Sequence, residues 1–175
     1  VNSNDWINKD FVITAKEGYN LSLTDTANGV WADSLTASDE TGNGKLTFFV
    51  KNTETGVISA AVTENYKIDK TAPTGEVKLN ERTAFQKFIN KITFGLFFKD
   101  TQEVTINAAD NSGIVFASYL VTDQDLSEAE LKSLVFGGYE EPFRIEPNGE
   151  YIVYAMLVDE SLNITYLRSD RITHD

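Results

Sequence analysis

The sequence predicts an all-β protein made of two β-sandwich domains in tandem. Three observations support this fold class. Apolar side chains recur at every second position, turn signals separate these runs, and the second half repeats the order of elements of the first half. A period of two sends one face of a strand to a core and the other to water, and many short strands separated by turns are typical of sandwiches.

Composition fits this fold class and excludes several functions. The chain has 175 residues, of which 41% are hydrophobic and 24% are charged. No apolar run approaches the roughly 20 residues that span a bilayer, so no membrane insertion is expected. The net charge of −12 disfavours nucleic acid as a partner. There is no cysteine, which excludes disulfides and thiolate metal sites and leaves an extracellular location open.

The first half contains four alternating runs that predict strands. They are residues 11–15, 21–24, 46–50 and 57–62. Between them, the pairs Asn28-Gly29, Asn43-Gly44 and Thr55-Gly56 predict tight turns, because Asn and Gly tolerate a positive φ. The sequence begins in mid-pattern, so we expect it to be part of a longer chain.

A domain boundary is predicted near Pro73. Proline cannot donate a hydrogen bond to a strand ladder, and Gly75 frees the backbone. We therefore expect a smaller domain at residues 1–70, a linker at 71–75 and a larger domain at 76–175. A new strand follows the linker at once, and so short a connection favours a semi-rigid joint over a floppy tether.

The second half mixes strands with one or two short helices. Residues 83–90 place Phe85, Phe88 and Ile89 at helical spacing. Residues 127–134 form the best helical pattern, with Ser127 able to cap its amino end and Glu130 at the capping-box position. The predicted strands are residues 76–79, 92–98, 104–108, 115–121, 143–145, 151–158 and 163–167.

The two halves resemble each other and resemble a known family. In both halves an Asn-Gly pair, a strand, a turn and a second strand follow one another in order, and the second half carries an insertion that holds the Ser127 helix. Residues 66–73, 92–100, 104–106 and 110–113 are similar to bacterial Ig-like repeats of Gram-positive cell-surface proteins. The turn at 159–163 resembles the usual turn of these repeats, with Leu162 in place of Gly.

This resemblance implies two tandem immunoglobulin-like domains located outside the cell, at the cell surface or wall. It carries no catalytic or ligand-binding residue. The implied partners are neighbouring repeats of the same chain. The predicted function is a non-catalytic spacer or adhesion module of a secreted bacterial surface protein. The alternatives are a module that binds a carbohydrate or a host protein, and an accessory domain of a secreted hydrolase.

We predict no catalytic residue, no cofactor and no metal site. The single histidine, His174, lies at the extreme C-terminus, where a catalytic or zinc-binding histidine is not held in packed structure. Acidic clusters are interpreted as solvated turns because the Asp-x-Asp-x-Asp-Gly pattern of a calcium loop is absent. These clusters are Asp33 with Asp39 and Glu40, Asp123 with Asp125, and Asp159 with Glu160. Asp125 is expected to precede and cap the Ser127 helix.

Two further hypotheses concern single side chains. Trp31 and Tyr139 are the candidate ligand contacts, as aromatic anchors for a glycan or an extracellular protein. Packing in a core or between domains is the preferred interpretation of both rings. A Lys–Asn isopeptide bond involving Lys51, Asn52 and Asp10 is a less favoured hypothesis for a cysteine-free surface stalk.

Overall fold

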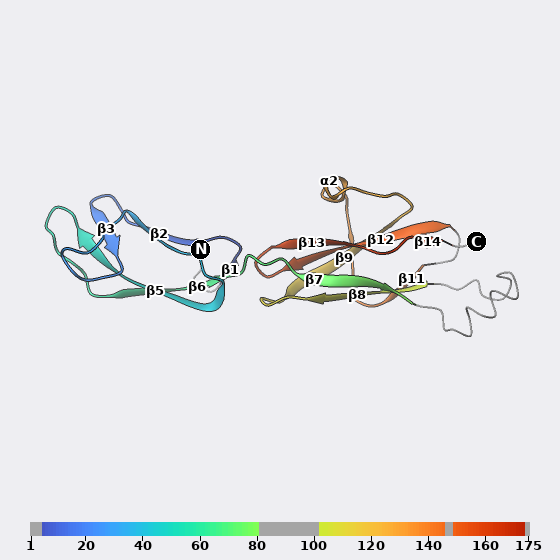
Figure 1. The fold of residues 1–175 in the computed structure, drawn as a ribbon, viewed down its shortest axis with the longest axis horizontal. Coiled ribbons are helices and arrows are strands. Elements are labelled where there is room, and N and C mark those ends of the chain that lie inside the picture. Colours follow the sequence, from blue (N-terminus) through green and yellow to red (C-terminus); the bar gives the residue numbers. More distant parts are fainter. Residues whose placement is uncertain (1–4, 81–101, 146–148, 174–175) are drawn as a thin grey trace, which may run out of the picture. The chain divides into compact units, whose positions relative to one another are not determined.

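The computed structural model describes residues 5–80, 102–145 and 149–173 (Figure 1). It divides into two compact units. Unit 1 comprises Val1–Thr71 with Glu160–Asn163, and unit 2 comprises Ala72–Asp159 with Ile164–Asp175. Each unit is described by itself below.

The described part of unit 1 contains six β-strands. A sheet in the order β1-β6-β5-β3 faces the two-stranded pair β2-β4. The strands are β1 (Trp6–Ile7), β2 (Phe11–Thr14), β3 (Tyr19–Ser22), β4 (Ser34–Ala37), β5 (Thr41–Asn52) and β6 (Val62–Ile68). The pair β1-β6 is parallel, and the others are antiparallel.

The core of unit 1 is small. Its buried apolar side chains are Leu21, Phe48 and Ile68, from β3, β5 and β6. The Phe11 ring of β2 stacks on the Tyr66 ring of β6 at a centroid distance of 5.2 Å, which joins the two layers. Because a unit of this size buries little apolar surface, such an aromatic contact adds to its stability.

Two predictions for unit 1 are wrong. Asn43-Gly44 is not a hairpin turn but lies inside β5, beside a register shift in its pairing with β6. A Cβ at Gly44 would lie 2.3 Å from the Tyr66 ring, so glycine leaves room for the aromatic stack. Residues 57–62 are not a strand: β6 begins at Val62, and the segment before it touches β5 through an isolated bridge at Ile58.

Unit 2 is a sandwich of a larger and a smaller sheet. The larger has the order β10-β9-β12-β13, with β14 also paired to β12, and the smaller has the order β11-β8-β7. The strands are β7 (Thr74–Leu79), β8 (Gln102–Ala109), β9 (Ile114–Thr122), β10 (Gly137–Gly138), β11 (Phe143–Ile145), β12 (Glu150–Asp159), β13 (Ile164–Arg168) and β14 (Ile172–Thr173).

The central strand β12 is buried on both faces. On its inner face, Val153, Ala155 and Leu157 pack with residues of the smaller sheet such as Val104 and Ile106. On its outer face, Ile152 and Tyr154 pack with Leu131 of the short helix α2 (Glu128–Leu131). Figure 1 shows α2 on the side of this sheet away from β7 and β8. The insertion that carries α2 therefore covers a sheet face that would otherwise meet water.

The predicted cap of this helix is confirmed. The Ser127 side chain accepts a hydrogen bond from the Glu130 backbone N–H, and the Glu130 carboxylate accepts one from the Ser127 backbone N–H. These two bonds satisfy amide donors that a helix start leaves free. The helical pattern at residues 83–90 and the strand at 92–98 lie outside the described residues.

Together these sheets confirm the predicted fold class. In its described residues the chain is all-β apart from one short helix, and its strands form two tandem β-sandwich units, the second of which carries the helix. Within the described ranges, no helix is long and apolar enough to cross a membrane.

Candidate functional site

Trp31 is the predicted contact residue whose surroundings best suit a ligand. It precedes β4, and its neighbour Ala32 exchanges two backbone hydrogen bonds with Leu21 of β3, at 2.8 and 2.9 Å. The indole Nε1–H donates to the Thr26 carbonyl oxygen at 3.3 Å. The Lys51 Nζ lies 4.7 Å from the ring centroid. The half-buried ring is thus held in one orientation by contacts on its edge and face.

Three polar side chains form a row beside this ring. Asn20 of β3 is the cross-strand partner of Lys51 of β5. On its other side, the Asn20 Nδ2–H donates to Asp33 Oδ1 at 2.7 Å. Since successive side chains of a strand point to opposite faces, this row lies on the face opposite to the buried Leu21.

The same face is open to solvent farther along β5. Phe49 lies two residues from Lys51 and is half-buried, and Thr47 lies two residues beyond that. The Thr47 and Thr63 hydroxyl groups are 2.9 Å apart and both residues are exposed. We call the surface formed by Asn20, Trp31, Asp33, Phe49 and Lys51 the Trp31 face. It combines two aromatic rings with an amide, a carboxylate and an ammonium.

Tyr139, the second predicted contact residue, makes core contacts in unit 2. Its hydroxyl oxygen accepts a hydrogen bond from the Ile106 backbone N–H at 3.0 Å. Its ring meets that of Phe143 edge to face, with centroids 6.4 Å apart, and packs against the cluster of Ile106, Ala155 and Leu157. These contacts give Tyr139 a structural role, and the ligand contact expected of it stays a prediction.

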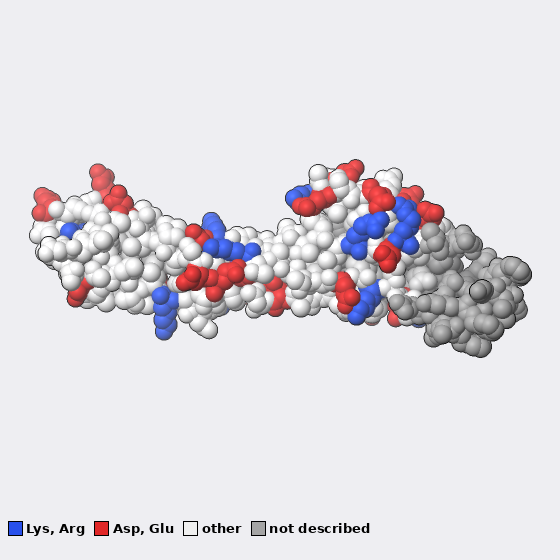
Figure 2. Space-filling model, in the orientation of Figure 1, with Lys and Arg blue, Asp and Glu red and all other residues white. Residues whose placement is uncertain are grey.

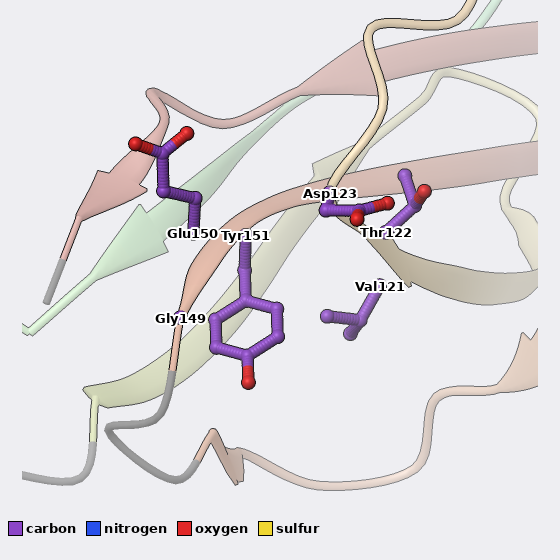
Figure 3. A pocket seen from close by; sticks show the side chains of 6 residues that line it. All are labelled: Val121, Thr122, Asp123, Gly149, Glu150 and Tyr151. Carbon is purple, nitrogen blue, oxygen red and sulfur yellow. The ribbon is translucent and has the colours of Figure 1, made fainter.

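Unit 2 contains a polar pocket where β9 ends and β12 begins (Figure 3). Its lining residues are Val121, Thr122, Asp123, Gly149, Glu150 and Tyr151. Figure 3 shows the Glu150 carboxylate directed away from the Tyr151 ring, and this carboxylate accepts a hydrogen bond from Arg171 Nη1 at 3.2 Å. The two acidic side chains of the pocket therefore do not converge on a shared point.

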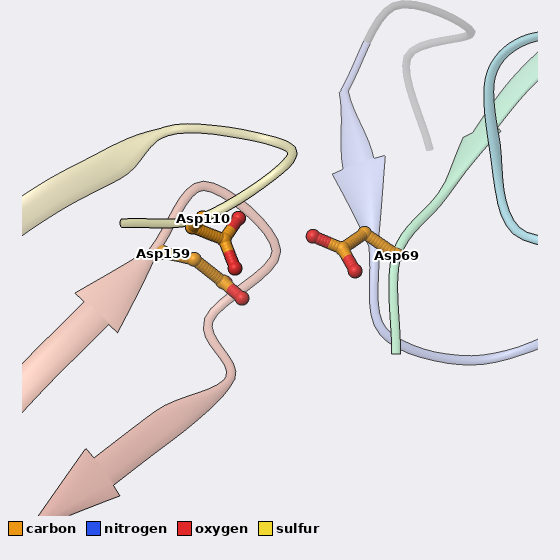
Figure 4. A group of neighbouring side chains, drawn as sticks. All are labelled: Asp69, Asp110 and Asp159. Carbon is orange, nitrogen blue, oxygen red and sulfur yellow. The ribbon is translucent and has the colours of Figure 1, made fainter. Parts of the chain in front are cut away.

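Two carboxylates meet at one end of unit 2. Asp110 follows β8 and Asp159 ends β12 (Figure 4), and an oxygen of one lies within 4.8 Å of an oxygen of the other. Asp159 is fully buried, so the prediction that it lies in a solvated turn is wrong. Asp110 Oδ1 accepts hydrogen bonds from the Ser112 N–H and hydroxyl, each at 2.8 Å.

Asp69 of unit 1 is a second fully buried carboxylate that the sequence did not single out. Its Oδ1 accepts a hydrogen bond from the Thr71 N–H at 3.0 Å. Its Oδ2 has no hydrogen-bond partner in the part of the chain that the structure describes. Nothing in the sequence pattern distinguishes Asp69 from an exposed acid at the end of a strand.

Asp125 belongs to an ion-pair network rather than to the cap of α2. Its Oδ1 accepts from Arg168 Nη2 at 2.5 Å, and its Oδ2 accepts from Arg171 Nη2 at 2.7 Å. Arg171 also contacts Glu150. Figure 2 shows such a mixture of acidic and basic side chains on unit 2. The prediction that Asp125 caps the helix is wrong, since these arginines take up its oxygens and Ser127 occupies the N-cap.

This network has a consequence that titration can measure. Hydrogen bonds from Arg168 and then Arg171 hold the pKa of Asp125 below its ordinary value of 3.8. A depressed folded-state pKa stabilises the protein above the unfolded-state pKa, and this contribution is lost as the pH falls through the folded value. We expect Arg168→Met to raise the Asp125 pKa toward 3.8, as followed by NMR of the side-chain carboxyl carbon. Arg144→Met, which removes an arginine paired with Glu103, should leave that titration unchanged.

The other candidate residues are placed as follows. His174 lies outside the described residues. The Asp10 carboxylate forms an ion pair with Lys70, whereas the Lys51 ammonium lies over Trp31. In the isopeptide hypothesis Asp10 and Lys51 act together, but in the structure each of them contacts a different residue.

Comparisons with known proteins found matches among solved structures and none among family models or curated sequences. No family model and no curated protein sequence matches the chain. Among solved structures, 11 chains match. One contains the FN1–FN3 domains of chicken CNTN1, with 13% sequence identity and a TM-score of 0.39. The match covers 98% of this chain and 65% of that chain.

At this identity and TM-score, nothing known of that protein transfers to this chain. The fold class rests on the sheets themselves.

Proposed function

We propose that the chain is a non-catalytic spacer or adhesion module of a secreted bacterial cell-surface protein, with neighbouring repeats of the same chain as its partners. The observation that carries this proposal is the connection between β6 and β7. It consists of residues 69–73 alone, and it ends at the buried Pro73. A connection this short and proline-containing has few conformations available.

Side chains bind the backbone of this connection. The Asn163 Nδ2 group donates to the Asp69 carbonyl oxygen at 3.0 Å and to the Thr71 carbonyl oxygen at 3.2 Å. The Thr165 hydroxyl donates to the Pro73 carbonyl oxygen at 2.6 Å. Carbonyl groups that are bound in this way are not free to reorient, which supports a stiff spacer over a flexible tether.

The test is the mobility of residues 69–73 in the intact chain. For the non-proline residues of this segment we expect NMR order parameters of the backbone amides of about 0.85, which is the value of a rigid backbone. Asn163→Ala should lower them, because it frees two carbonyl groups at once. Asn65→Ala, which removes an exposed asparagine of β6, serves as the matched control and should change nothing there.

Order parameters below about 0.6 in the unmodified chain would show a flexible connection and would contradict the stiff-spacer proposal.

The location proposed for the module is outside the cell. The likeness of residues 66–73 to bacterial Ig-like repeats supports this location, and so does the tandem sandwich architecture, which many cell-surface domains share. Binding of a carbohydrate or an extracellular protein is the second candidate function. Of the two predicted contact residues, Trp31 supports it through the geometry of the Trp31 face.

A further inference from the structure

We propose that the Trp31 face of unit 1 is a binding site for a neutral saccharide, with one sugar ring stacked on the Trp31 indole. The inference rests on the second candidate function, binding of a carbohydrate or an extracellular protein, and it assigns a ligand class and five residues to one sheet face. Its basis is the combination of a fixed aromatic ring with hydrogen-bonding groups beside it. A pyranose needs both, since it has an apolar C–H face and a rim of hydroxyl groups.

The indole supplies the apolar half of this recognition. The electron-rich face of an aromatic ring attracts the weakly positive C–H groups of a sugar, as it attracts a cation. Trp31 is already fixed by its Nε1–H bond to Thr26 and by the backbone bonds of Ala32 to Leu21. A ring that is ordered before binding loses little entropy when a ligand arrives.

Asn20 and Asp33 supply the polar half. Their mutual hydrogen bond of 2.7 Å fixes the amide and the carboxylate side by side. Asp33 is exposed, so its carboxylate is accessible to ligand hydroxyl groups. A carboxylate accepts hydrogen bonds and an amide both donates and accepts, which matches the paired donor and acceptor character of adjacent sugar hydroxyls.

The Lys51 ammonium occupies the face of the Trp31 ring on which the sugar would stack, and the sugar displaces it. In the structure this ammonium lies over the indole, 4.7 Å from the centroid. A sugar that stacks on that face replaces the ammonium, which then donates hydrogen bonds to sugar hydroxyls from the side. The Asn20–Lys51 strand pairing keeps this ammonium next to the polar row.

A saccharide suits this face better than a protein does. The cores of protein interfaces are depleted in charged residues and bury about 800 Å² per partner. Here Trp31 and Phe49 are the apolar residues, the Lys51 ammonium lies over the Trp31 ring, and Asp33 is bound to Asn20 on the same face. The opposite charges of Asp33 and Lys51 offset each other, which favours a neutral ligand over a charged polymer.

Binding is measured by calorimetry on the unmodified full chain and on each variant. Fluorescence uses the full chain carrying Trp6→Phe, because the sequence has two tryptophans and this variant leaves Trp31 as the single tryptophan reporter. The probes are chitohexaose, cellohexaose, maltoheptaose and mannohexaose, with sialyllactose as the charged arm, followed by a printed glycan array. We expect at least one neutral glycan to change Trp31 emission and to shift the amide signals of β3 and β5.

Two kinds of variant separate binding from folding. Trp31→Ala should weaken binding by about tenfold or more, the equivalent of ~1.4 kcal/mol. Asn20→Ala and Asp33→Ala remove the polar row from a sheet face without touching the core, and should weaken binding several-fold at unchanged melting temperature. Trp6→Phe is the matched control, since Trp6 also lies beside a lysine, Lys67, whose Nζ is 5.7 Å from its ring.

Three results would overturn the proposal. In the first, no neutral glycan binds. In the second, Asp33→Ala and Trp31→Ala both leave glycan binding intact. In the third, Trp6→Phe weakens glycan binding as much as Trp31→Ala does. A protein ligand that shifts the same signals while every glycan fails would overturn the saccharide assignment as well.

Discussion

Leu157→Ala is expected to destabilise unit 2 by about 2–5 kcal/mol, the range measured for leucine deletions in packed cores. Leu157 is fully buried on the inner face of β12 and packs with Ile106 and Ala155. The removed methyl groups leave a cavity that the two sheets cannot close without breaking their own strand pairing. Since native domains are stable by only about 5–15 kcal/mol, such a loss is a large fraction of the total.

The measurement is denaturant unfolding of the full chain, combined with hydrogen exchange at the amides of β12. The matched control is Leu134→Ala, because Leu134 is 43% exposed in the same unit. That variant should change stability by no more than about 0.5 kcal/mol. If both leucine variants lost the same stability, β12 would not be the centre of the core of unit 2.

Much of unit 2 could be predicted from the sequence because its local signals agree with its tertiary structure. The strands at residues 104–108, 143–145 and 151–158 all occur, extended by one or two residues at some ends. The Ser127 cap was predictable because a capping box depends on residues three apart in the sequence. The burial of both faces of β12 was not, because it depends on where the insertion with α2 packs.

The failure at Asn43-Gly44 has a tertiary cause. The pair was interpreted as a turn from local φ preference, yet Gly44 is required because the Tyr66 ring occupies the space of a side chain. This contact joins residues distant in sequence, so no local pattern encodes it.

The candidate site was predictable in part. Trp31 was identified from its place after a turn, whereas Asn20, Asp33 and Lys51 were not, because strand register brings them to its side. The register is fixed by the Leu21–Ala32 bridge and by the pairing of β3 with β5. The burial of Asp159 was missed for the same reason, since the sequence shows an acidic residue at a turn and not what packs around it.

Gly75→Ala is expected to cost about 1–3 kcal/mol, as overpacking of a close contact does. The sequence suggested that Gly75 loosens a linker, but the structure places it in β7, where its cross-strand partner is Ala108. A Cβ at this position would lie 2.3 Å from the Asn107 carbonyl oxygen and 2.8 Å from a Leu157 methyl carbon.

The nature of the obstacle decides the size of this effect. A methyl group can be displaced by a change of rotamer, but a carbonyl oxygen moves only with the backbone of β8, which disturbs the β7-β8 ladder on both sides. Gly138→Ala is the matched control, because Gly138 is also a strand residue of unit 2 and nothing lies within 4 Å of its added Cβ. Denaturant unfolding should therefore show a clear loss for Gly75→Ala and little change for Gly138→Ala. Equal stabilities would mean that β7 approaches β8 less closely in solution, and that glycine at this position serves the chain's flexibility rather than its packing.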